Sequence, residues 1–366
     1  MQMIPVYQPS LCGKEREYVI DCLDSSWISS KGKYIDLFEK AFAEYTGIKY
    51  GASVCNGTVA LHVALKALGI GQGDEVIVPT FTYIASVNAI AYTGASPVFV
   101  DSLPETWQMD PADVRRKISN RTKAIMVVHL YGHPCDMLFL KNIVEEKNLI
   151  MIEDCAEGIG SRVEGKHVGG FGDIAAFSFF GNKTITTGEG GMVLTNNKKL
   201  HENIVHLKGQ GLAKDRQYWH DAIGYNYRMT NICAAIGLAQ MERIEIFIER
   251  KLEIANRYRM AFNGTNILFH KQDKGVSHSY WMCSVLIEEA TKRDELREYL
   301  AEKGIETRPL FFPAHTMPIY SHLAKSDYPV AEDIAMRGIN LPSYPSLTNS
   351  QIDYICEMIL GFFEVR

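Results

Sequence analysis

A lysine in a loop of small residues is the first group in this sequence that could do covalent chemistry. An apolar run at residues 173–179 contains Ser178, and Lys183 and then Gly188-Glu189-Gly190-Gly191 follow it. Lysine side chains are seldom buried, and a desolvated amine loses its proton readily and becomes a nucleophile. Because a lysine beside a glycine-rich loop is more commonly a surface residue, this segment alone leaves both interpretations open.

Carboxylates follow a second apolar run, at residues 149–153. Glu153, Asp154 and Glu157 stand at its carboxyl end, which is where open α/β sheets bind their ligands. No set of His, Cys or acidic residues has supporting metal-ligand spacing, so we predict no metal. A solvated acid or a helix cap is the simpler alternative for these residues taken alone.

A small polar turn separates a strand-like run at residues 49–54 from a helical pattern at 57–68. Asn56, Gly57 and Thr58 form this turn. Free N–H groups and the dipole at a helix start attract phosphate, a glycine lets the backbone approach the anion, and a threonine adds a hydroxyl. The longer glycine motifs of nucleoside-triphosphate and dinucleotide sites are absent, so the turn by itself is more often a plain cap.

Together the three segments supply what pyridoxal 5'-phosphate requires. That cofactor needs a lysine for its covalent link, a carboxylate that keeps the pyridine nitrogen protonated, and a phosphate anchor. Asp154 and Lys183 are 183 − 154 = 29 residues apart, which leaves room for about one loop and one strand. The combination predicts a pyridoxal phosphate enzyme with its site at the carboxyl ends of the strands.

The elements that must position these groups alternate between strand-like and helix-like between about residues 46 and 196. Continuous apolar runs are typical of strands that a mostly parallel sheet buries on both faces. The predicted strands are residues 49–54, 75–79, 96–100, 123–129, 149–153, 173–179 and 190–195. The fold class is therefore α/β, with a mostly parallel sheet of seven strands.

Helical periodicity predicts the remaining elements. The predicted helices are residues 57–68, closed by Gly69, one long helix over about 230–262, and two more at 293–303 and 352–363. After residue 263 the pattern is α+β, which indicates a second unit. We expect an N-terminal segment at 1–14, a large cofactor domain at 15–245 and a smaller C-terminal domain at 246–366, with the N-terminal segment packed beside the latter.

Charge and composition limit the partners. The 366 residues include 38 Lys+Arg and 43 Asp+Glu, for a net charge of −5, which disfavours nucleic acids and anionic membranes. No apolar stretch approaches the roughly 18 residues of a membrane span, and the N-terminus does not resemble a signal peptide. The eight scattered cysteines indicate free thiols in a reducing compartment, so we expect a cytoplasmic protein.

A series of motifs in a fixed order extends over nearly the whole chain. They are Asn56-Gly57-Thr58, Pro79-Thr80-Phe81-Thr82-Tyr83-Ile84-Ala85-Ser86, His129-Leu130-Tyr131-Gly132, Glu153-Asp154-Cys155-Ala156-Glu157, Phe177-Ser178-Phe179 with Lys183, Gly188-Glu189-Gly190-Gly191 and Gly224-Tyr225-Asn226-Tyr227-Arg228-Met229. In these motifs the sequence resembles the DegT/StrS family of nucleotide-sugar aminotransferases, which have the aspartate aminotransferase-type fold (fold type I) of pyridoxal phosphate enzymes. The resemblance implies a homodimer with shared active sites.

The resemblance also implies roles for individual residues. Lys183 would carry the cofactor covalently and later move protons, and Asp154 would pair with the pyridine nitrogen. The other implied cofactor contacts are Asn56, Gly57, Thr58 and Ser178 around the phosphate, Tyr83 on the ring, Glu157 near the ring hydroxyl, and Asn226 at the phosphate of the neighbouring subunit's cofactor. One branch of the family replaces the lysine by histidine and performs dehydration, and Lys183 argues against that branch.

Narrower signatures resemble one subgroup of the family, which aminates GDP-4-keto-6-deoxy-mannose with glutamate to give GDP-perosamine for surface polysaccharides such as the O-antigen of lipopolysaccharide. They are Trp27-Ile28-Ser29-Ser30, Asp154-Cys155-Ala156-Glu157, Phe179-Phe180-Gly181-Asn182-Lys183-Thr184-Ile185-Thr186-Thr187, Arg216-Gln217-Tyr218-Trp219 and Pro313-Ala314-His315-Thr316-Met317-Pro318. The predicted substrate contacts are Trp27, Arg216, His315 and Tyr320. Trp27 could equally be a core anchor, and His315 a hydrogen-bonding loop residue.

Two other functions fit the same residues. One is a 4-aminotransferase that acts on a UDP- or dTDP-linked 4-keto-6-deoxy sugar, because periodicity and spacing cannot identify a sugar. The other is a non-catalytic regulator that binds pyridoxal phosphate as a sensor. The intact Lys183, with no additional DNA-binding segment at either end, disfavours the regulator.

Overall fold

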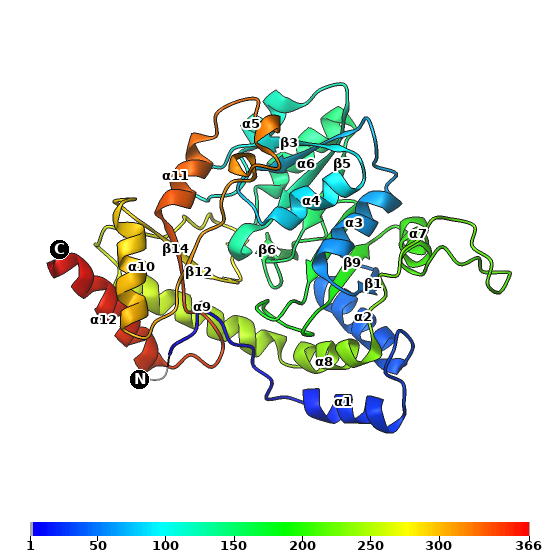
Figure 1. Ribbon diagram of the computed structural model, residues 1–366, viewed down its shortest axis with the longest axis horizontal. Helices are drawn as coiled ribbons and strands as arrows, with labels where there is room; N and C mark the ends of the chain where they lie inside the picture. Colours follow the sequence, from blue (N-terminus) through cyan, green and yellow to red (C-terminus); the bar gives the residue numbers. More distant parts are fainter. Residues whose placement is uncertain (1–2, 366) are drawn as a thin grey trace.

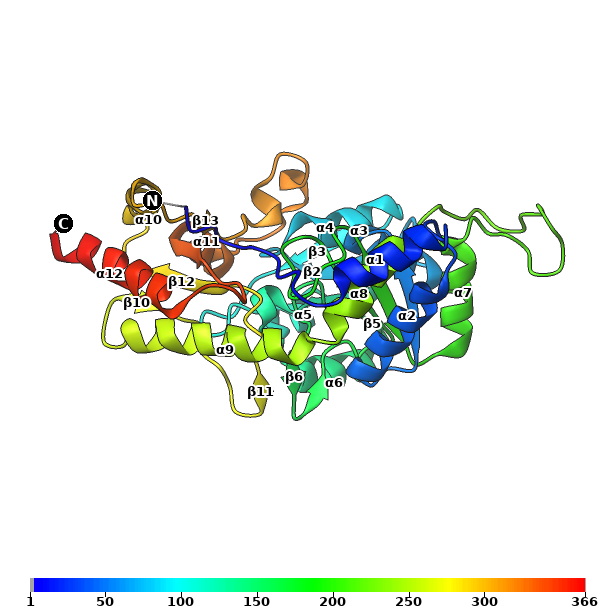
Figure 2. The same ribbon diagram turned by 90° about the horizontal axis from the view of Figure 1, so that it is seen from below.

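The computed structural model describes residues 3–365, which form an elongated molecule with a sheet at each end (Figure 1). The larger sheet is formed within residues 50–195 and the smaller one by residues beyond 266. The long helix α9 (Ile244–Ala261) runs between the two parts (Figure 2). The exact domain boundaries stay a prediction.

The seven-stranded sheet confirms the predicted fold class. Its strands are β1 (Tyr50–Val54), β2 (Glu75–Pro79), β3 (Ser96–Val100), β4 (Thr122–Val128), β5 (Ile150–Asp154), β8 (Ile174–Ser178) and β9 (Gly191–Thr195). The order across the sheet is β1-β9-β8-β5-β4-β2-β3. Strand β9 runs antiparallel to both of its neighbours, and every other pairing is parallel.

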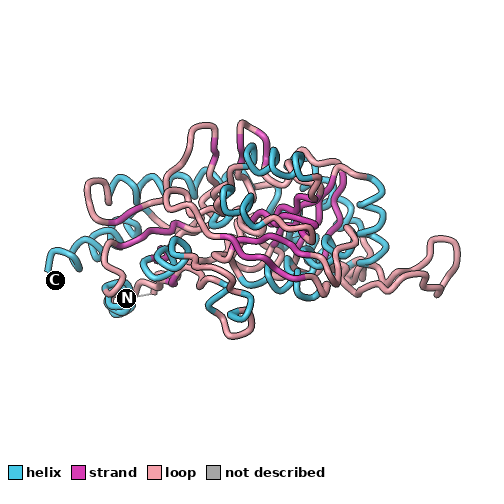
Figure 3. Tube along the Cα trace, turned by 90° about the horizontal axis from the view of Figure 1, so that it is seen from above, coloured by secondary structure: helices cyan, strands magenta, loops and turns pink. Residues whose placement is uncertain are grey.

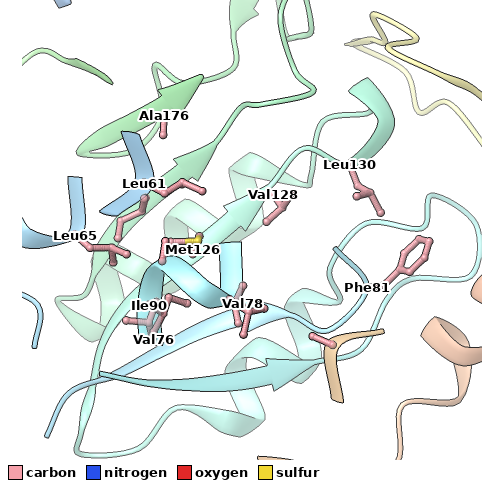
Figure 4. Close-up of a cluster of buried hydrophobic side chains, with 14 of the residues drawn as sticks. Leu61, Leu65, Val76, Val78, Phe81, Ile90, Met126, Val128, Leu130 and Ala176 are labelled. Carbon is pink, nitrogen blue, oxygen red and sulfur yellow. The ribbon is translucent and has the colours of Figure 1, made fainter. Parts of the chain in front are cut away.

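Alternate residues of each strand enter separate cores on the two faces of this sheet, as the two-residue period of a strand requires. On one face, Val76 and Val78 of β2 and Met126 of β4 pack under α3 (Gly57–Ala67) and α4 (Ile84–Tyr92) (Figure 4). On the other face, Ile77 and Ile125 pack under α5 (Pro111–Lys117) and α6 (Met137–Lys147). Burial on both faces explains why these strands read as continuous apolar runs.

The long helix predicted over residues 230–262 is wrong in one respect, because the chain forms two helices there. Helix α8 (Asn231–Met241) ends where the Arg243 N–H bonds to the Gln240 carbonyl at 3.1 Å, and α9 begins at Ile244. The Gln240 side chain is held by the Glu15 carboxylate at 2.5 Å, which ties α8 to α1 (Glu15–Asp24). The break lets α8 pack on α1 and α2 (Lys33–Thr46) while α9 leads toward the smaller sheet.

The smaller sheet has the strand order β10-β12-β14-β13. Its strands are β10 (Ile267–Leu268), β12 (Cys283–Ile287), β13 (Arg308–Pro309) and β14 (Gly338–Leu341), and helices α10 (Lys292–Glu302), α11 (Pro329–Arg337) and α12 (Asn349–Val365) lie beside it. Helices α10 and α12 confirm two of the predicted helices. The N-terminal segment reaches this part of the molecule, since the Ile4 N–H bonds to the Gly304 carbonyl at 2.8 Å.

One long segment extends from the body of the chain. Within residues 209–230, between α7 (Lys198–Lys208) and α8, a loop projects beyond the larger sheet in two views (Figures 2 and 3). Elsewhere, β6 (Arg162–Val163), β7 (Lys166–His167) and β11 (Val276–Ser277) form a short third sheet. Within residues 3–365, no helix combines the length and the apolar character that crossing a bilayer would require.

Candidate active site

The three predicted segments meet at one edge of the seven-stranded sheet. Parallel strands β1, β5 and β8 all end at this edge, and they deliver Asn56, Asp154 and Ser178 respectively. Because β9 is antiparallel, it starts at the same edge, directly after the glycine-rich loop. This is the edge at which open α/β sheets bind ligands.

Lys183 places its amine against an aromatic ring and a carboxylate. The side chain is 12 % exposed, and Nζ lies 3.7 Å from Glu157 Oε1 and 3.8 Å from the centroid of the Trp281 ring. Burial lowers the pKa of the Lys183 amine below its ordinary value, while Glu157 and Asp154 act in the opposite direction. The amine is therefore easier to deprotonate than a surface lysine.

Glu157 is a buried partner for this amine. Its Oε2 accepts a hydrogen bond from the Tyr131 backbone N–H at 2.6 Å. Burial raises the pKa of the Glu157 carboxyl to about 7, although the nearby Lys183 and the Tyr131 N–H favour the ionised form. A carboxyl with a pKa near neutrality can both accept and release the proton of Lys183.

Asp154 is held by a short chain of hydroxyl groups. Ser86 Oγ donates to Asp154 Oδ2 at 2.7 Å, and the Ser86 and Thr82 hydroxyls are 3.2 Å apart. The Ala156 N–H donates to the other carboxylate oxygen at 3.0 Å. Burial raises the pKa of Asp154, and these donors together with Lys183 oppose that effect. A buried carboxylate fixed in this way can pair with a protonated ring nitrogen.

The turn at residues 56–58 provides unpaired donors beside Ser178. Asn56 caps α3, with its side-chain oxygen accepting from the Val59 N–H at 3.0 Å. Within residues 3–365, no acceptor is bonded to the N–H of Gly57 or of Thr58. A Cβ on Gly57 would lie 2.7 Å from Ser178 Cβ, so only glycine fits between the helix start and this serine.

These groups match pyridoxal phosphate in kind and number. The amine of Lys183 can bind the aldehyde, the carboxylate of Asp154 can bind the ring nitrogen, and the donors around Gly57 can bind a dianionic phosphate. We conclude that the residues fit the cofactor.

Comparison with known proteins gives the same result. The model of the DegT/DnrJ/EryC1/StrS aminotransferase family matches residues 9–360. The chain belongs to this family.

Its relatives in this family include two proteins named GDP-perosamine synthase. The one from Escherichia coli O157:H7 is 63 % identical over 99 % of both chains, and the one from Vibrio cholerae is 52 % identical over 99 % of both. Among solved structures, the PLP form of a putative sugar aminotransferase, Spr1654 from Streptococcus pneumoniae, has a TM-score of 0.94 at 30 % identity and covers 99 % of both chains. The family is dependent on pyridoxal phosphate, so the predicted enzyme class, fold and cofactor are confirmed.

Two other predicted cofactor contacts of this aminotransferase lie on exposed surfaces. Tyr83 precedes α4, is 56 % exposed and has its ring 5.5 Å from that of Phe311. Asn226 is exposed and forms a backbone bridge with Gly209, where the projecting segment returns to the body. The adjacent Tyr227 carbonyl accepts from the Cys55 N–H at 2.8 Å, which keeps this strand of chain beside the phosphate turn.

The four predicted substrate residues are dispersed over the single chain. Trp27 is exposed in the connection between α1 and α2, and Arg216 lies on the projecting segment with its guanidinium carbon 3.9 Å from the Trp219 ring centroid. His315 and Tyr320 are buried, with their polar atoms already paired.

His315 and Tyr320 connect the C-terminal part to the larger sheet. His315 Nδ1 lies 2.7 Å from the Thr80 hydroxyl, and its Nε2 lies 3.0 Å from Glu332 Oε1. The Tyr320 hydroxyl donates to the Asn88 side chain at 2.7 Å. Their role in substrate binding stays a prediction.

A histidine, a glutamate and a cysteine also cluster behind the site. His129, Glu153 and Cys155 bring possible metal ligands within 4.8 Å of one another. Glu153 Oε1 and Oε2 already accept three backbone N–H bonds at 2.6–2.7 Å, and Oε2 lies 3.1 Å from His129 Nε2. We interpret the cluster as part of a buried hydrogen-bond network with a structural role.

Sequence reasoning missed three groups that surround the predicted site. Ser86 belongs to a motif that carries the family resemblance, but the sequence did not predict its hydrogen bond to Asp154. Trp281 and Tyr7, whose hydroxyl donates to the Lys183 carbonyl, come from distant parts of the chain. No local pattern marks either residue.

Proposed function

We propose that this aminotransferase moves the amino group of glutamate to the 4-keto carbon of GDP-4-keto-6-deoxy-D-mannose, giving GDP-perosamine and 2-oxoglutarate. The observation that carries the proposal is the 63 % identity, over 99 % of both chains, to the Escherichia coli O157:H7 protein named GDP-perosamine synthase. The site of Lys183, Glu157 and Asp154 provides the groups that the reaction needs.

Pyridoxal phosphate supplies an aldehyde that takes up the amino group and a ring that disperses the electron pair released at the reacting carbon. Lys183 Nζ would hold the aldehyde and, when free, would take the proton from the α-carbon of glutamate. Glu157 Oε1 lies 3.7 Å from Lys183 Nζ. It would accept the proton that Nζ loses when the amine becomes neutral. In the second half-reaction Lys183 would return a proton to the sugar carbon.

The other residues keep the reacting groups in place. Asp154 would keep a proton on the ring nitrogen, and Ser86 orients its carboxylate through the 2.7 Å bond. The N–H groups of Gly57 and Thr58 and the Ser178 hydroxyl would hold the phosphate. Trp281 covers the amine and excludes water.

The test is a substrate panel with the loaded enzyme. Glutamate is incubated with the GDP-, UDP- and dTDP-linked 4-keto-6-deoxy sugars, and the products are identified by mass spectrometry and NMR, with Lys183→Ala as the control. Amination of the GDP sugar alone is the expected result. Amination of a UDP or dTDP sugar would replace the proposed substrate, and no product from any sugar with a normal cofactor spectrum would favour the regulator.

We also propose a homodimer in the cytoplasm whose sites are completed across the interface. Asn226 is exposed beside the projecting segment, so it is free to reach a partner's phosphate site. Mixing inactive Lys183→Ala and Asn226→Ala subunits tests this, because a mixed dimer then contains one intact site. Recovery of activity supports sharing, and a mixture as inactive as its components contradicts it.

The proposed substrate contacts are Trp27, Arg216, His315 and Tyr320. Arg216 would bind the diphosphate through charge-assisted hydrogen bonds, and its place on the projecting segment suits a contact to a partner's site. Substitution of Arg216 by Ala should raise the Michaelis constant for the sugar nucleotide and leave that for glutamate unchanged. An equal effect on both constants would contradict a diphosphate contact.

A further inference from the structure

A buried ammonium group lies in the long helix between the two parts of the molecule. Lys251 of α9 has no exposed surface. Its Nζ donates to the Trp281 carbonyl at 3.0 Å, the Ser343 carbonyl at 2.9 Å and the Ser343 hydroxyl at 3.4 Å. Within residues 3–365, no carboxylate forms an ion pair with it.

Burying a charge without a counter-charge is costly, and three acceptors from neutral groups offset only part of that cost. Burial accordingly lowers the pKa of Lys251 to about 8, and the nearby Cys283 acts in the opposite direction. An apolar side chain of similar length would fill the same space without this cost. A role in positioning the groups bonded to Lys251 Nζ therefore explains the buried ammonium group better than a contribution to stability does.

One of the groups that Lys251 holds is the residue that covers the reactive amine. The ring of Trp281 lies 3.8 Å from Lys183 Nζ, and its Nε1–H donates to the Asn182 carbonyl at 2.7 Å. The same ring is parallel, within 6°, to the ring of Tyr131. The indole N–H of Trp281 is thus fixed by Asn182 and its ring face by Tyr131, whereas its backbone carbonyl is fixed by Lys251.

A second path joins the same two lysines. The Tyr7 hydroxyl donates to the Lys183 carbonyl, and the Tyr7 ring centroid lies 5.2 Å from Lys251 Nζ. The Val6 carbonyl accepts from the Ser343 N–H at 3.1 Å. Lys251 therefore contacts Trp281 and Tyr7, which donate to the carbonyls of Asn182 and Lys183.

We propose that Lys251 is a positioning residue whose ammonium group fixes the backbones of Trp281 and Ser343, so that the indole stays over Lys183 Nζ and keeps water from that amine. The inference rests on the proposed role of Lys183. It adds a residue from the helix between the two parts of the molecule to the set that controls the amine.

The consequence of losing Lys251 follows from the surroundings of Lys183. Burial is the largest cause of the lowered pKa of Lys183, and Glu157 and Asp154, from the end of β5, oppose it. If the indole moves, water reaches Nζ and the pKa of Lys183 rises toward its ordinary value. The charged groups near Nζ are unchanged, because Lys251→Met alters neither carboxylate.

The experiment measures the amine directly. The full-length protein, stripped of cofactor, is treated with an amine-reactive reagent over a range of pH, and labelling of Lys183 is quantified by peptide mass spectrometry. The midpoint of the rate against pH reports the pKa of Lys183, and the plateau at high pH reports access to the reagent. We expect Lys251→Met to raise the midpoint by about one pH unit, roughly a tenfold loss of neutral amine at pH values below the midpoint.

Two comparisons separate positioning from general destabilisation. Trp281→Ala should raise the midpoint as well, and adding Lys251→Met to it should raise it no further. Tyr258→Phe is the matched control, since it removes a buried 2.9 Å hydrogen bond between the same helix and the Pro342 carbonyl without touching Trp281. Its midpoint should remain that of the wild type.

A wild-type midpoint in Lys251→Met, or an equal shift in Tyr258→Phe, would overturn the proposal. If Lys251→Met does not fold, Lys251→Gln, which lacks the charge and is shorter, must shift the midpoint in the same direction, and an unshifted midpoint there overturns it too. Labelling requires neither substrate nor turnover, so failure of the substrate panel would leave this measurement intact.

Discussion

Substituting Gly57 by Ala would test whether the start of α3 is built around the cofactor's phosphate. The new Cβ would lie 2.7 Å from Ser178 Cβ and 2.9 Å from Ser178 Oγ, both closer than real Cβ contacts allow. Either the serine or the first turn of the helix must therefore move. Both are proposed phosphate ligands, so the displacement should appear as weaker cofactor binding.

The size of the effect follows from the cost of overpacking. Forcing an extra methyl into a packed site costs about 1–3 kcal/mol. Without cofactor the site can relax, whereas the bound phosphate requires the original arrangement, so most of that cost falls on the bound state. Since about 1.4 kcal/mol is a factor of ten, the dissociation constant of pyridoxal phosphate should rise roughly 5- to 150-fold.

The assay is a titration of the stripped protein with pyridoxal phosphate, followed by visible absorbance. Gly181→Ala is the matched control, because a Cβ at Gly181 meets no atom within 4 Å and its φ lies outside the left-handed region. A second comparison places Gly57→Ala in a Ser178→Gly background, where the closest contacts are removed. A wild-type affinity for pyridoxal phosphate in Gly57→Ala would refute the steric argument. So would a double variant whose loss of affinity equals the sum of the losses in Gly57→Ala and Ser178→Gly.

Four further outcomes are expected. Lys183→Ala should lose turnover together with the visible band of the lysine-bound cofactor, and an active variant would contradict the assignment. Ser86→Ala should lower kcat by roughly tenfold, with substrate Michaelis constants unchanged, because the Asp154 carboxylate loses a buried donor worth about 1–3 kcal/mol. Glu157→Gln should flatten the pH dependence of thermal stability in the stripped protein. Burial raises the pKa of Glu157 from 4.5 to about 7, so wild-type stability falls by roughly 3 kcal/mol as pH rises through this interval. His315→Ala should lower the melting temperature, since both ring nitrogens are paired; a raised Michaelis constant for the sugar nucleotide with unchanged melting would instead indicate direct contact.

The sheet was predictable because its strands are buried on both faces. Each of β2, β4, β5 and β8 places alternate apolar residues in separate cores, so the sequence shows continuous apolar runs with little ambiguity. All seven predicted strands agree with the structure to within about two residues. The break between α8 and α9 was not predictable, because residues 242–243 carry no glycine or proline and only the packing of Gln240 on α1 explains it.

The site was predictable to the extent that it lies at strand ends. Asp154 and Ser178 are the last residues of β5 and β8, so topology alone brings them to one edge. Trp281 and Lys251 escaped prediction for the opposite reason. Trp281 contacts Lys183, and Lys251 contacts the Trp281 carbonyl, across sequence separations that only the packing of the C-terminal part on the larger sheet can close.

The protein has a net charge of −5, and the donors at the proposed phosphate turn are neutral backbone N–H groups. Together these facts raise the question of how the site binds an anion. Two carboxyl groups, Asp154 and Glu157, accompany one amine in a buried site, and burial raises the pKa of both acids. A site with two ionised carboxylates would repel a phosphorylated ligand, whereas a proton shared between Glu157 and Lys183 removes one of those charges. The remaining charge, on Asp154, would be neutralised by a protonated ring nitrogen beside it. The backbone N–H groups at the start of α3 would then bind the phosphate, which is how an acidic protein can hold an anionic cofactor tightly.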